Sequence, residues 1–335
     1  MNSLELFKTQ KFYQIDISIL KDLGYDVLLS NRIFDSLLFW KYDILFSYFY
    51  RYSFFAALLA KCFGKKTYFT GGIDSLDSDY ASAFNYKIQA LFFKLCYWVA
   101  DSCIIVSQSD LKNIFKVSSL KKKLSYSEHV INTKLFIADV PKEKIFTSIV
   151  WMGDEGNVVR KGVDKALQIF AELKKIPEFV DYRFVIIGRK GEGEVLVRSI
   201  IDKYNLKGSV ELKGEVSEED KINLLKRSKY YFQLSLYEGF GLAALEALCA
   251  NNIIIHSGKG GLANPIYKEQ LLFDIDNDFD SELLKLVNKL ACFTPITSYD
   301  NLLEYYDIQR RKDDFEAIIA VSYTHLRAHE TLRHL

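Results

Sequence analysis

Short apolar runs alternate along the chain with longer segments in which apolar positions recur at helical spacing. The short runs predict buried strands and the longer segments predict helices. Helices are expected over residues 8–23, 53–63 and 80–100, and strands over residues 25–29, 43–49, 66–70 and 101–107. Gly24 and Gly64 follow two of these helices and are expected to cap them, because glycine readily adopts the left-handed conformation at a helix C-terminus. Such an alternation is typical of a doubly wound parallel sheet.

A second alternation begins after residues 137–146, where Pro141 lies among lysines and a glutamate and predicts a linker. Strands are expected over 148–152, 183–187, 210–212, 230–236 and 253–256, and helices over 165–175, 194–204, 218–227 and 242–250. The pattern therefore predicts an α/β protein of two Rossmann-like domains, residues 1–140 and 147–320.

Composition narrows the class of protein. The chain has 335 residues, 49% of them hydrophobic, which is enough for two cores, and its formal net charge of +1 gives no field to recruit nucleic acid. Five scattered cysteines without CxxC spacing indicate thiols in a reducing compartment. No apolar stretch of about 18 residues is free of charge, and the opening has no signal-peptide pattern, so a cytoplasmic protein is expected.

Aromatic residues make up 15% of the chain and concentrate in residues 34–55 and 84–98, between lysines and arginines. They either fill a core or contact a membrane surface. The last residues, 321–335, differ in composition, because three of the five histidines lie there. This segment resembles a translated sequencing adapter and is expected to be a non-native tail.

Residues 230–262 show the order strand, glycine turn, helix, strand, glycine turn. Glu238 precedes the expected helix and Glu246 lies in its second turn, so both carboxylates can face the opening where the glycine turns meet. A helix N-terminus attracts anions, and carboxylates accept hydrogen bonds from hydroxyls, so a nucleotide sugar would fit. The alternative is that Glu238 only complements the helix dipole and that Glu246 lies on a solvated helix face.

The string E-G-F-G-L-x-x-L-E-A-L, followed by G-x-G-G-L, resembles the donor-site signature of retaining glycosyltransferases of family 4. That resemblance implies a GT-B fold, with two Rossmann-like domains facing a cleft. It implies transfer of a sugar from a nucleoside diphosphate sugar to a glycan, a lipid-linked sugar or a small molecule, in polysaccharide biosynthesis and without a metal. Glu246 would bind the ribose hydroxyls and Glu238 a sugar hydroxyl, and the expected donor-binding turn comprises Gly239, Phe240, Gly241 and Leu242.

Two adjacent cations, Arg160 and Lys161, stand at a glycine turn before a helix. They either hold a diphosphate or form a solvated helix start. In the family an Arg and a later Lys-Gly bind the donor diphosphate; Lys161 matches the Lys-Gly, while Asp154 occupies the usual place of the Arg, whose role Arg160 is expected to take.

Glycines after two further strands are expected to line the donor pocket. The segment 187–191, which contains Gly188, lacks the G-x-G-x-x-G spacing of a dinucleotide-binding fingerprint. By resemblance, Gly188 would line the nucleotide pocket, and Gly214 and Val216 would contact the base.

The first half offers acceptor-side candidates. The turn after residue 70 is either a simple tight turn or, by its resemblance to the interdomain cleft loop of GT-B enzymes, part of an acceptor site with Gly71, Gly72 and Asp74. His129 lies in a segment similar to the family's end of this domain, and is either a satisfied loop histidine or an acceptor-side group. The family's first strand and its glycine-rich loop are not visible in the opening residues, so that strand is expected to be missing.

Two aspartate-rich segments do not predict a metal site. Asp274 and Asp278 lie in a loop that has Phe279 and Lys285 where an EF-hand needs Gly and Glu, and the pair Asp77 and Asp79 is a common loop sequence. Two other functions stay open: a GT-B nucleotide-sugar epimerase or hydrolase, and a non-catalytic nucleotide-binding partner subunit.

Overall fold

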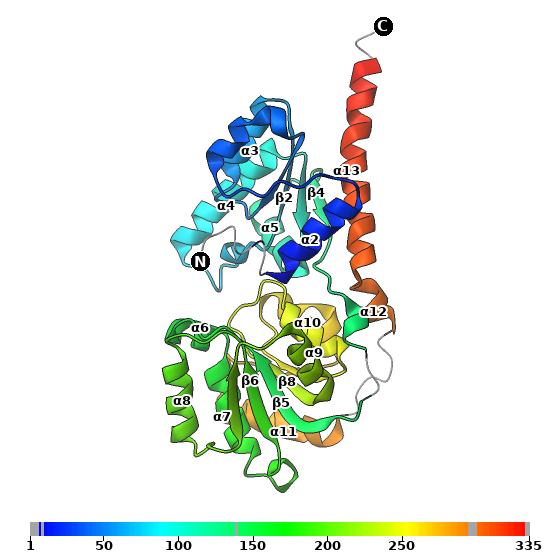
Figure 1. Ribbon diagram of the computed structural model, residues 1–335. Helices are drawn as coiled ribbons and strands as arrows, with labels where there is room; N and C mark the ends of the chain where they lie inside the picture. The colour runs from blue at the N-terminus through cyan, green and yellow to red at the C-terminus, as the bar shows by residue number, and fades with distance from the viewer. Residues whose placement is uncertain (1–6, 8–9, 138–139, 294–299, 332–335) are drawn as a thin grey trace. The chain divides into compact units, whose positions relative to one another are not determined.

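The chain folds into two compact units, residues 1–131 with 304–335, and residues 132–303. The structure is a computed structural model that describes residues 7, 10–137, 140–293 and 300–331 (Figure 1). No helix among these residues is long and apolar enough to cross a membrane. The two units are described separately.

A four-stranded parallel sheet forms the centre of the first unit, and its strands lie in sequence order. The strands are β1 (Ile44–Tyr48), β2 (Lys66–Thr70), β3 (Ser102–Ile105) and β4 (Leu124–Tyr126). Helices α3 (Phe54–Cys62), α4 (Ala83–Val99) and α5 (Gln108–Val117) connect them, and the unit also contains α2 (Lys11–Asp22), the short helices η1 (Ile33–Leu37), η2 (Phe39–Lys41) and η3 (Asp74–Leu76), and α13 (Ile308–Thr331).

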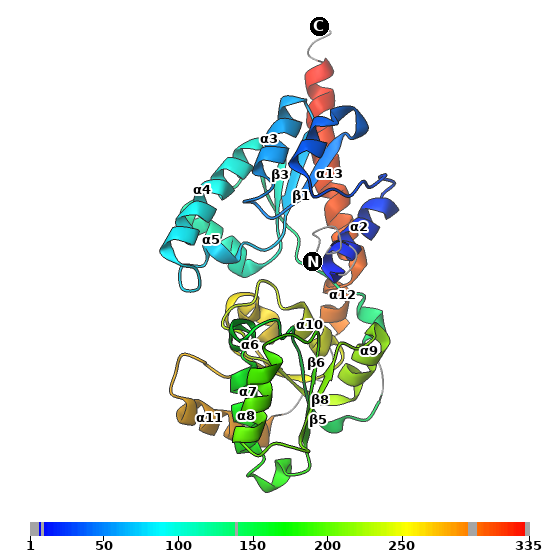
Figure 2. The ribbon, with the colours of Figure 1, turned by 60° about the vertical axis from the view of Figure 1, so that its left-hand side comes forward.

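The two faces of this sheet bury different layers because side chains alternate along a strand. Phe69 and Ile105 face a core shared with α3 and α4, whereas Ile104 faces Ile19 of α2 and Phe315 of α13. Figure 2 shows α3 and α4 on one side of the sheet and α2 and α13 on the other.

Residues 25–29 form no strand, contrary to the prediction. Gly24 ends α2 in the left-handed conformation, with φ of +90°, and the Tyr25 N–H bonds back to the Leu20 carbonyl at 3.0 Å. The segment that follows is irregular, and Leu28 is 66% exposed. Its short apolar run was misleading because a strand needs a neighbour to pair with, and the described residues provide none.

Helix α13 belongs with the first unit, whereas residues up to 320 were predicted to belong to the second domain. The fully buried Arg311 holds it there: its guanidinium donates to both oxygens of Asp16 on α2, at 2.6 and 2.8 Å. Arg311 also donates to the Ser127 carbonyl at 2.6 Å, and the Tyr48 hydroxyl donates to Asp16 at 2.8 Å. This bidentate pair joins residues far apart in sequence, which explains why local patterns did not assign the helix.

The second unit contains a six-stranded parallel sheet of order β7-β6-β5-β8-β9-β10. Its strands are β5 (Glu143–Ile149), β6 (Arg183–Ile187), β7 (Val210–Gly214), β8 (Ser228–Gln233), β9 (Ile253–His256) and β10 (Leu271–Leu272). Its helices are α6 (Glu155–Arg160), α7 (Val163–Leu173), α8 (Glu194–Lys203), α9 (Glu218–Arg227), α10 (Leu242–Cys249) and α11 (Phe279–Cys292), while α12 (Asp300–Tyr305) leads back to the first unit. The strand order reverses between β5 and β8, which is the arrangement of a doubly wound sheet.

Strand β5 begins at Glu143, inside the segment that was predicted as a linker. Lysines and a glutamate at its start obscured the pattern, but Ile145 and Phe146 are buried in the two cores on opposite faces of the sheet. The charges lie where the strand enters the sheet, and Glu143 pairs there with Arg227 at 2.5 Å. The strand predicted over 148–152 therefore overlaps only the end of β5, and the other predicted strands of this unit overlap β6, β7, β8 and β9.

We expect Arg311→Met to destabilise the first unit by about 3–5 kcal/mol, because it leaves the Asp16 carboxylate buried without its cation. Denaturant unfolding followed by circular dichroism measures the change. Lys144→Met is the control, because Lys144 and Asp181 form an exposed surface pair and its loss should cost less than about 1 kcal/mol. Equal effects of the two substitutions would contradict the anchoring role of Arg311.

Candidate functional site

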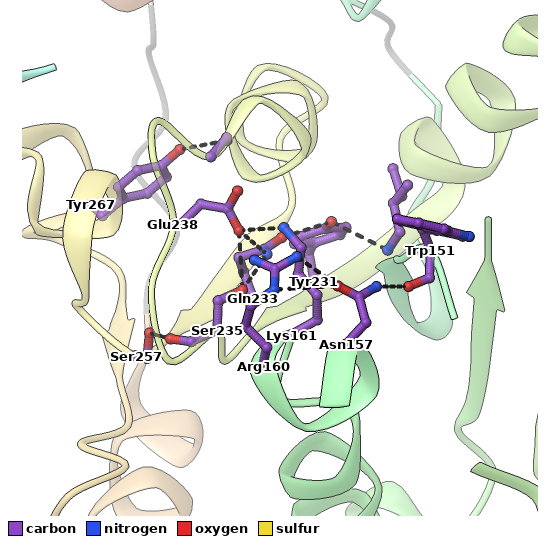
Figure 3. A network of polar contacts seen from close by, with 12 residues as sticks. Trp151, Asn157, Arg160, Lys161, Tyr231, Gln233, Ser235, Glu238, Ser257 and Tyr267 are labelled. Atoms are coloured by element: carbon purple, nitrogen blue, oxygen red, sulfur yellow. Dashed lines mark hydrogen bonds and ion pairs between the residues drawn. The ribbon is translucent and has the colours of Figure 1, made fainter. Parts of the chain in front are cut away.

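The candidate site lies at the carboxyl edge of the second sheet, where the strand order reverses between β5 and β8. Parallel α/β sheets bind ligands at this point, because the loops that follow the two strands turn to opposite faces and leave a crevice. Strand β8, helix α6 and the segments that follow β5, β8 and β9 supply the polar side chains of Figure 3.

Glu238 is the centre of a polar network on the loop after β8. One of its oxygens, Oε2, accepts hydrogen bonds from Lys161 Nζ at 2.7 Å, Gln233 Nε2 at 3.1 Å and Ser235 Oγ at 3.1 Å. Figure 3 shows the second oxygen pointing away from these donors. The carboxylate is thus fixed by one oxygen while the other faces out of the network.

The donor from Gln233 is itself oriented by a relay through Tyr231. The Ile149 N–H donates to the Tyr231 hydroxyl at 3.3 Å, and that hydroxyl donates to Gln233 Oε1 at 3.1 Å. The amide nitrogen of Gln233 must then face Glu238. Burial raises the pKa of Tyr231, and the nearby carboxylates of Glu246 and Glu238 raise it further, so the hydroxyl keeps the proton it donates.

Glu246 lies on α10, is 6% exposed, and is therefore not on a solvated helix face. Its Oε2 pairs with Lys221 Nζ of α9 at 2.6 Å, and Lys221 also contacts Glu218 at 3.1 Å. Lys221 lies 5.9 Å from the centre of the Phe136 ring. The negative charges of Glu246 and Glu238 both raise the pKa of the buried Tyr231 hydroxyl.

The two predicted diphosphate-binding cations, Arg160 and Lys161, have different hydrogen-bond partners. Lys161 pairs with Glu238, and both side chains are partly exposed. Arg160 ends the short helix α6 and donates to Asn157 Oδ1 at 2.7 and 3.2 Å, while Asn157 donates to the Trp151 carbonyl. Asp154, which stands where the family has Arg, instead caps α6 by accepting the Asn157 N–H at 2.6 Å.

Glycines allow the loops of the site to touch through their backbones. A Cβ on Gly162 would lie 2.0 Å from the Leu234 carbonyl oxygen, one on Gly260 would lie 2.2 Å from the Glu238 carbonyl oxygen, and one on Gly261 would lie 2.6 Å from Phe240. Gly162 and Gly260 also have positive φ, which other residues seldom adopt. The loops after β5 and β9 are therefore packed directly against the loop that carries Glu238.

Residues 156–290, which include Lys161, Glu238 and Glu246, match the family model of glycosyl transferases group 1. This part of the second unit is therefore similar to group 1 glycosyltransferases. The chain is 31% identical over 163 residues to a GDP-mannose:cellobiosyl-diphosphopolyprenol alpha-mannosyltransferase of Xanthomonas oryzae, covering 42% of this chain and 40% of that protein. It is 30% identical over 105 residues to one chain of human phosphatidylinositol N-acetylglucosaminyltransferase, covering 31% of this chain and 21% of that protein. The chain thus spans less than half the length of these two relatives.

Solved structures show the same fold over nearly the whole chain. Sucrose-phosphate synthase from Thermosynechococcus elongatus superposes with a TM-score of 0.60 at 17% identity, covering 96% of this chain and 79% of that one. Anabaena HepE in complex with UDP-glucose superposes with a TM-score of 0.61 at 12% identity, covering 95% and 89%. These neighbours confirm the predicted GT-B fold class.

The remaining donor-side candidates lie on both sides of the point between β5 and β8 where the strand order reverses. A Cβ on Gly188 would lie 2.0 Å from the Val150 carbonyl oxygen, so this glycine lets the loop after β6 approach the end of β5. Gly214 ends β7 beside the Lys190 side chain, and Val216 packs on a small core cluster. Gly239 and Leu242 are half-buried, and Phe240 is buried beside Gly241, which has φ of +88°. Their roles in binding a donor stay predictions.

The acceptor-side candidates belong to the first unit. Gly71 has φ of +100° and Gly72 precedes the short helix that begins at Asp74. No motif pointed to their neighbour Asp110, which is fully buried and accepts the Ile73 N–H at 3.3 Å. Burial, with help from the negative charge of Asp74, raises the pKa of Asp110 to about 7.

His129 lies in the core of the first unit rather than at an open edge. It is buried, and its ring centre is 5.3 Å from that of Phe12. Burial, together with the positive charge of Arg311, lowers the pKa of His129 to about 3, so the ring is neutral. This environment favours a structural histidine over an acceptor-side group, which stays an untested role.

Both aspartate-rich segments have local structural roles. Asp274 accepts the Asp276 N–H at 3.1 Å, Asp278 caps α11 through the Ser281 N–H at 3.0 Å, and Asp77 accepts the Asp79 N–H at 2.9 Å. Within the described ranges, no three carboxylate, histidine or cysteine side chains gather as metal ligands would.

Gly260→Ala should lower the thermal midpoint more than Gly208→Ala, because only the first adds a methyl group against the Glu238 backbone. Both glycines have positive φ, +59° and +85°, so both substitutions introduce backbone strain, which costs about 1–2 kcal/mol. Nothing lies within 4 Å of a Cβ on Gly208, which makes it the matched control. Differential scanning fluorimetry gives the comparison; similar midpoints would show that the loops are not packed as described.

Proposed function

We propose that the chain is a retaining, metal-independent glycosyltransferase of family 4 that uses a nucleoside diphosphate sugar. One observation carries the proposal. Glu238 has one oxygen fixed by Lys161, Gln233 and Ser235 and the other directed out of the network, at the sheet position where α/β proteins bind ligands. A fixed carboxylate with an outward oxygen is suited to accept a hydrogen bond from a sugar hydroxyl. The group 1 family match and the neighbour solved with UDP-glucose support a nucleotide-sugar donor.

The proposed reaction breaks the bond between the anomeric carbon and the donor phosphate oxygen. The acceptor oxygen bonds to that carbon on the same face, and the acceptor proton passes to the departing phosphate oxygen. Negative charge grows on the leaving diphosphate, where Lys161, Arg160 and the N–H groups of Phe240 and Gly241 would stabilise it. Lys161 has three N–H donors, so it can bond Glu238 and a phosphate oxygen together.

Glu246 is proposed to accept hydrogen bonds from the ribose hydroxyls. Its ion pair with Lys221 fixes the orientation of the carboxylate against α9, and a carboxylate is purely an acceptor. Lys221 is in turn held by Glu218, so the ribose contact would be set by three side chains from two adjacent helices.

A lipid-linked acceptor is proposed, together with a cytoplasmic location at the membrane surface. The Xanthomonas relative is named for a diphosphopolyprenol acceptor and the human relative for phosphatidylinositol. The aromatic and basic segments of the first unit, 34–55 and 84–98, are proposed to supply peripheral contact with the membrane. All five cysteines are free thiols, which suits a reducing compartment.

We expect UDP, GDP or ADP sugars to raise the thermal midpoint of the wild type, because a ligand that binds only the folded state stabilises it by mass action. Glu246→Ala should abolish this shift by removing the ribose contact, whereas Glu219→Ala, an exposed position on α9, should leave it unchanged. Transfer to polyprenyl diphosphate acceptors, followed by NMR of the anomeric proton with and without EDTA, tests retention and metal independence. A shift that survives in Glu246→Ala would count against the assigned pocket.

Donor turnover without acceptor would identify an epimerase or hydrolase. Donor binding without any turnover would identify a non-catalytic subunit.

Gln233→Leu should weaken binding of the nucleotide sugar about ten-fold and leave binding of the nucleoside diphosphate unchanged. The substitution removes one hydrogen bond to the charged Glu238, a contribution of about 1.5 kcal/mol, and Glu238 is assigned to the sugar rather than to the nucleotide. Isothermal titration with both ligands separates the two effects. Gln168→Leu on α7 controls for loss of an amide, and an equal loss for both ligands would indicate general damage to the fold instead.

A further inference from the structure

One face of α4 in the first unit presents apolar and basic side chains to solvent. The helix has 17 residues, and its opposite face is built into the core through Phe93, Cys96 and Tyr97. Figure 2 shows α4 on the outer side of its sheet. The face of α4 opposite Phe93, Cys96 and Tyr97 is therefore exposed to solvent.

The outward face follows the helical repeat. Phe84, Leu91 and Trp98 are 71%, 55% and 71% exposed, and they recur every seven residues. Exposed Lys87 and Lys94 lie between them, also seven residues apart. These spacings place all five side chains along one stripe of the helix surface. Scattered exposed apolar residues are ordinary, but a continuous stripe of large ones marks a contact surface.

The charges on α4 all have one sign. Lys87 and Lys94 are its charged residues, and none of its 17 residues is Asp or Glu. A face intended for another protein would usually carry both signs, or few charges at its centre, since buried lysines are depleted in protein interfaces. Lysines between bulky apolar residues instead suit a bilayer, because their long stems can lie along the acyl boundary while the ammonium groups reach the phosphates.

We propose that the face of α4 formed by Phe84, Lys87, Leu91, Lys94 and Trp98 binds the surface of an anionic lipid bilayer. Phe84, Leu91 and Trp98 enter the boundary between head groups and acyl chains, where the amphipathic indole of Trp98 is stable. Lys87 and Lys94 pair with the anionic head groups. The helix lies in the plane of the membrane, with its Phe93 and Tyr97 face still packed on the sheet. This inference rests on the membrane contact proposed above and locates that contact on α4. Lipid binding by this face requires neither a donor nor turnover.

Flotation with lipid vesicles tests the proposal on the full chain. Vesicles of equal parts phosphatidylcholine and phosphatidylglycerol should carry the protein to the top of a gradient, and vesicles of phosphatidylcholine alone should carry much less. Lys87→Glu with Lys94→Glu should weaken binding to the anionic vesicles by about 30-fold or more, because each lysine contributes about 1 kcal/mol near an anionic surface. Lys203→Glu with Lys207→Glu, on the second unit, changes the net charge equally and should have little effect.

Tryptophan fluorescence tests the apolar part of the face. The chain has three tryptophans, so Trp40→Phe with Trp151→Phe leaves Trp98 as the single fluorophore. Its emission should shift to the blue on adding anionic vesicles. Leu91→Gln should reduce both the shift and the flotation, and Val195→Ser, at an exposed position on α8, should reduce neither. Circular dichroism confirms that each variant is folded.

Three results would overturn the proposal. One is equal flotation of the α4 charge variant and the second-unit charge variant, and another is no flotation of the wild type with anionic vesicles. The third is a dimer, seen by light scattering, that Trp98→Ser dissociates, since the face would then bind a second copy. Flotation needs no nucleotide, so the flotation assay and the thermal-shift assay with nucleotide sugars are independent. A negative flotation result would not contradict donor binding, and a missing thermal shift would not contradict lipid binding.

Discussion

Close contact between backbone atoms of three loops is the constraint on which the donor-side site depends. Gly162 lies against the Leu234 carbonyl, and Gly260 lies against the Glu238 carbonyl, each at a separation that leaves no room for a side chain. The Gly261 N–H bonds the Glu238 carbonyl at 2.5 Å. Because these contacts are made by the backbone, the position of Glu238 does not depend on flexible side chains. The glycines of the family signature are thus explained first by packing, because a side chain at these positions would collide with the neighbouring backbone.

Charge balance is the second property of the site. Glu238 is paired with Lys161, and Glu246 with Lys221, so each acid has a cation on an adjacent element. Each pair also offsets a negative charge at an edge where two unpaired carboxylates would repel a diphosphate. The proposed donor would meet carboxylates that can accept hydroxyl hydrogen bonds, and cations and helix amides that can stabilise its negative charge. The same local arrangement serves both the sugar and the pyrophosphate ends of the proposed ligand.

Local patterns predicted the elements of the second unit well, since β6, α9 and β9 begin and end near the expected residues. Strong apolar runs and a capping serine, Ser217, set these boundaries. Prediction failed where a tertiary partner decides the structure. Residues 25–29 form a short apolar run but have no described neighbour to pair with. The charged start of β5 is a strand because it lies between β6 and β8. Arg311 assigned α13 to the first unit through Asp16, a residue nearly the whole chain away.

The side chains that sequence reasoning missed around the site share one property: each acts through another residue. Gln233 is a polar residue inside an apolar strand, which was a visible signal, but its role follows only from the distance to Glu238. Lys221 looked like any surface lysine of α9 until its pairing with the buried Glu246 was seen. Signature motifs identify groups that meet a ligand, because those groups keep fixed spacing along the chain. The residues that orient such groups are chosen by three-dimensional proximity, so they can differ between relatives that keep the same motif. Tyr231 is linked both to an orienting residue and to the two candidate ligand-binding carboxylates. Its buried hydroxyl orients Gln233, and the charges of Glu246 and Glu238 raise its pKa.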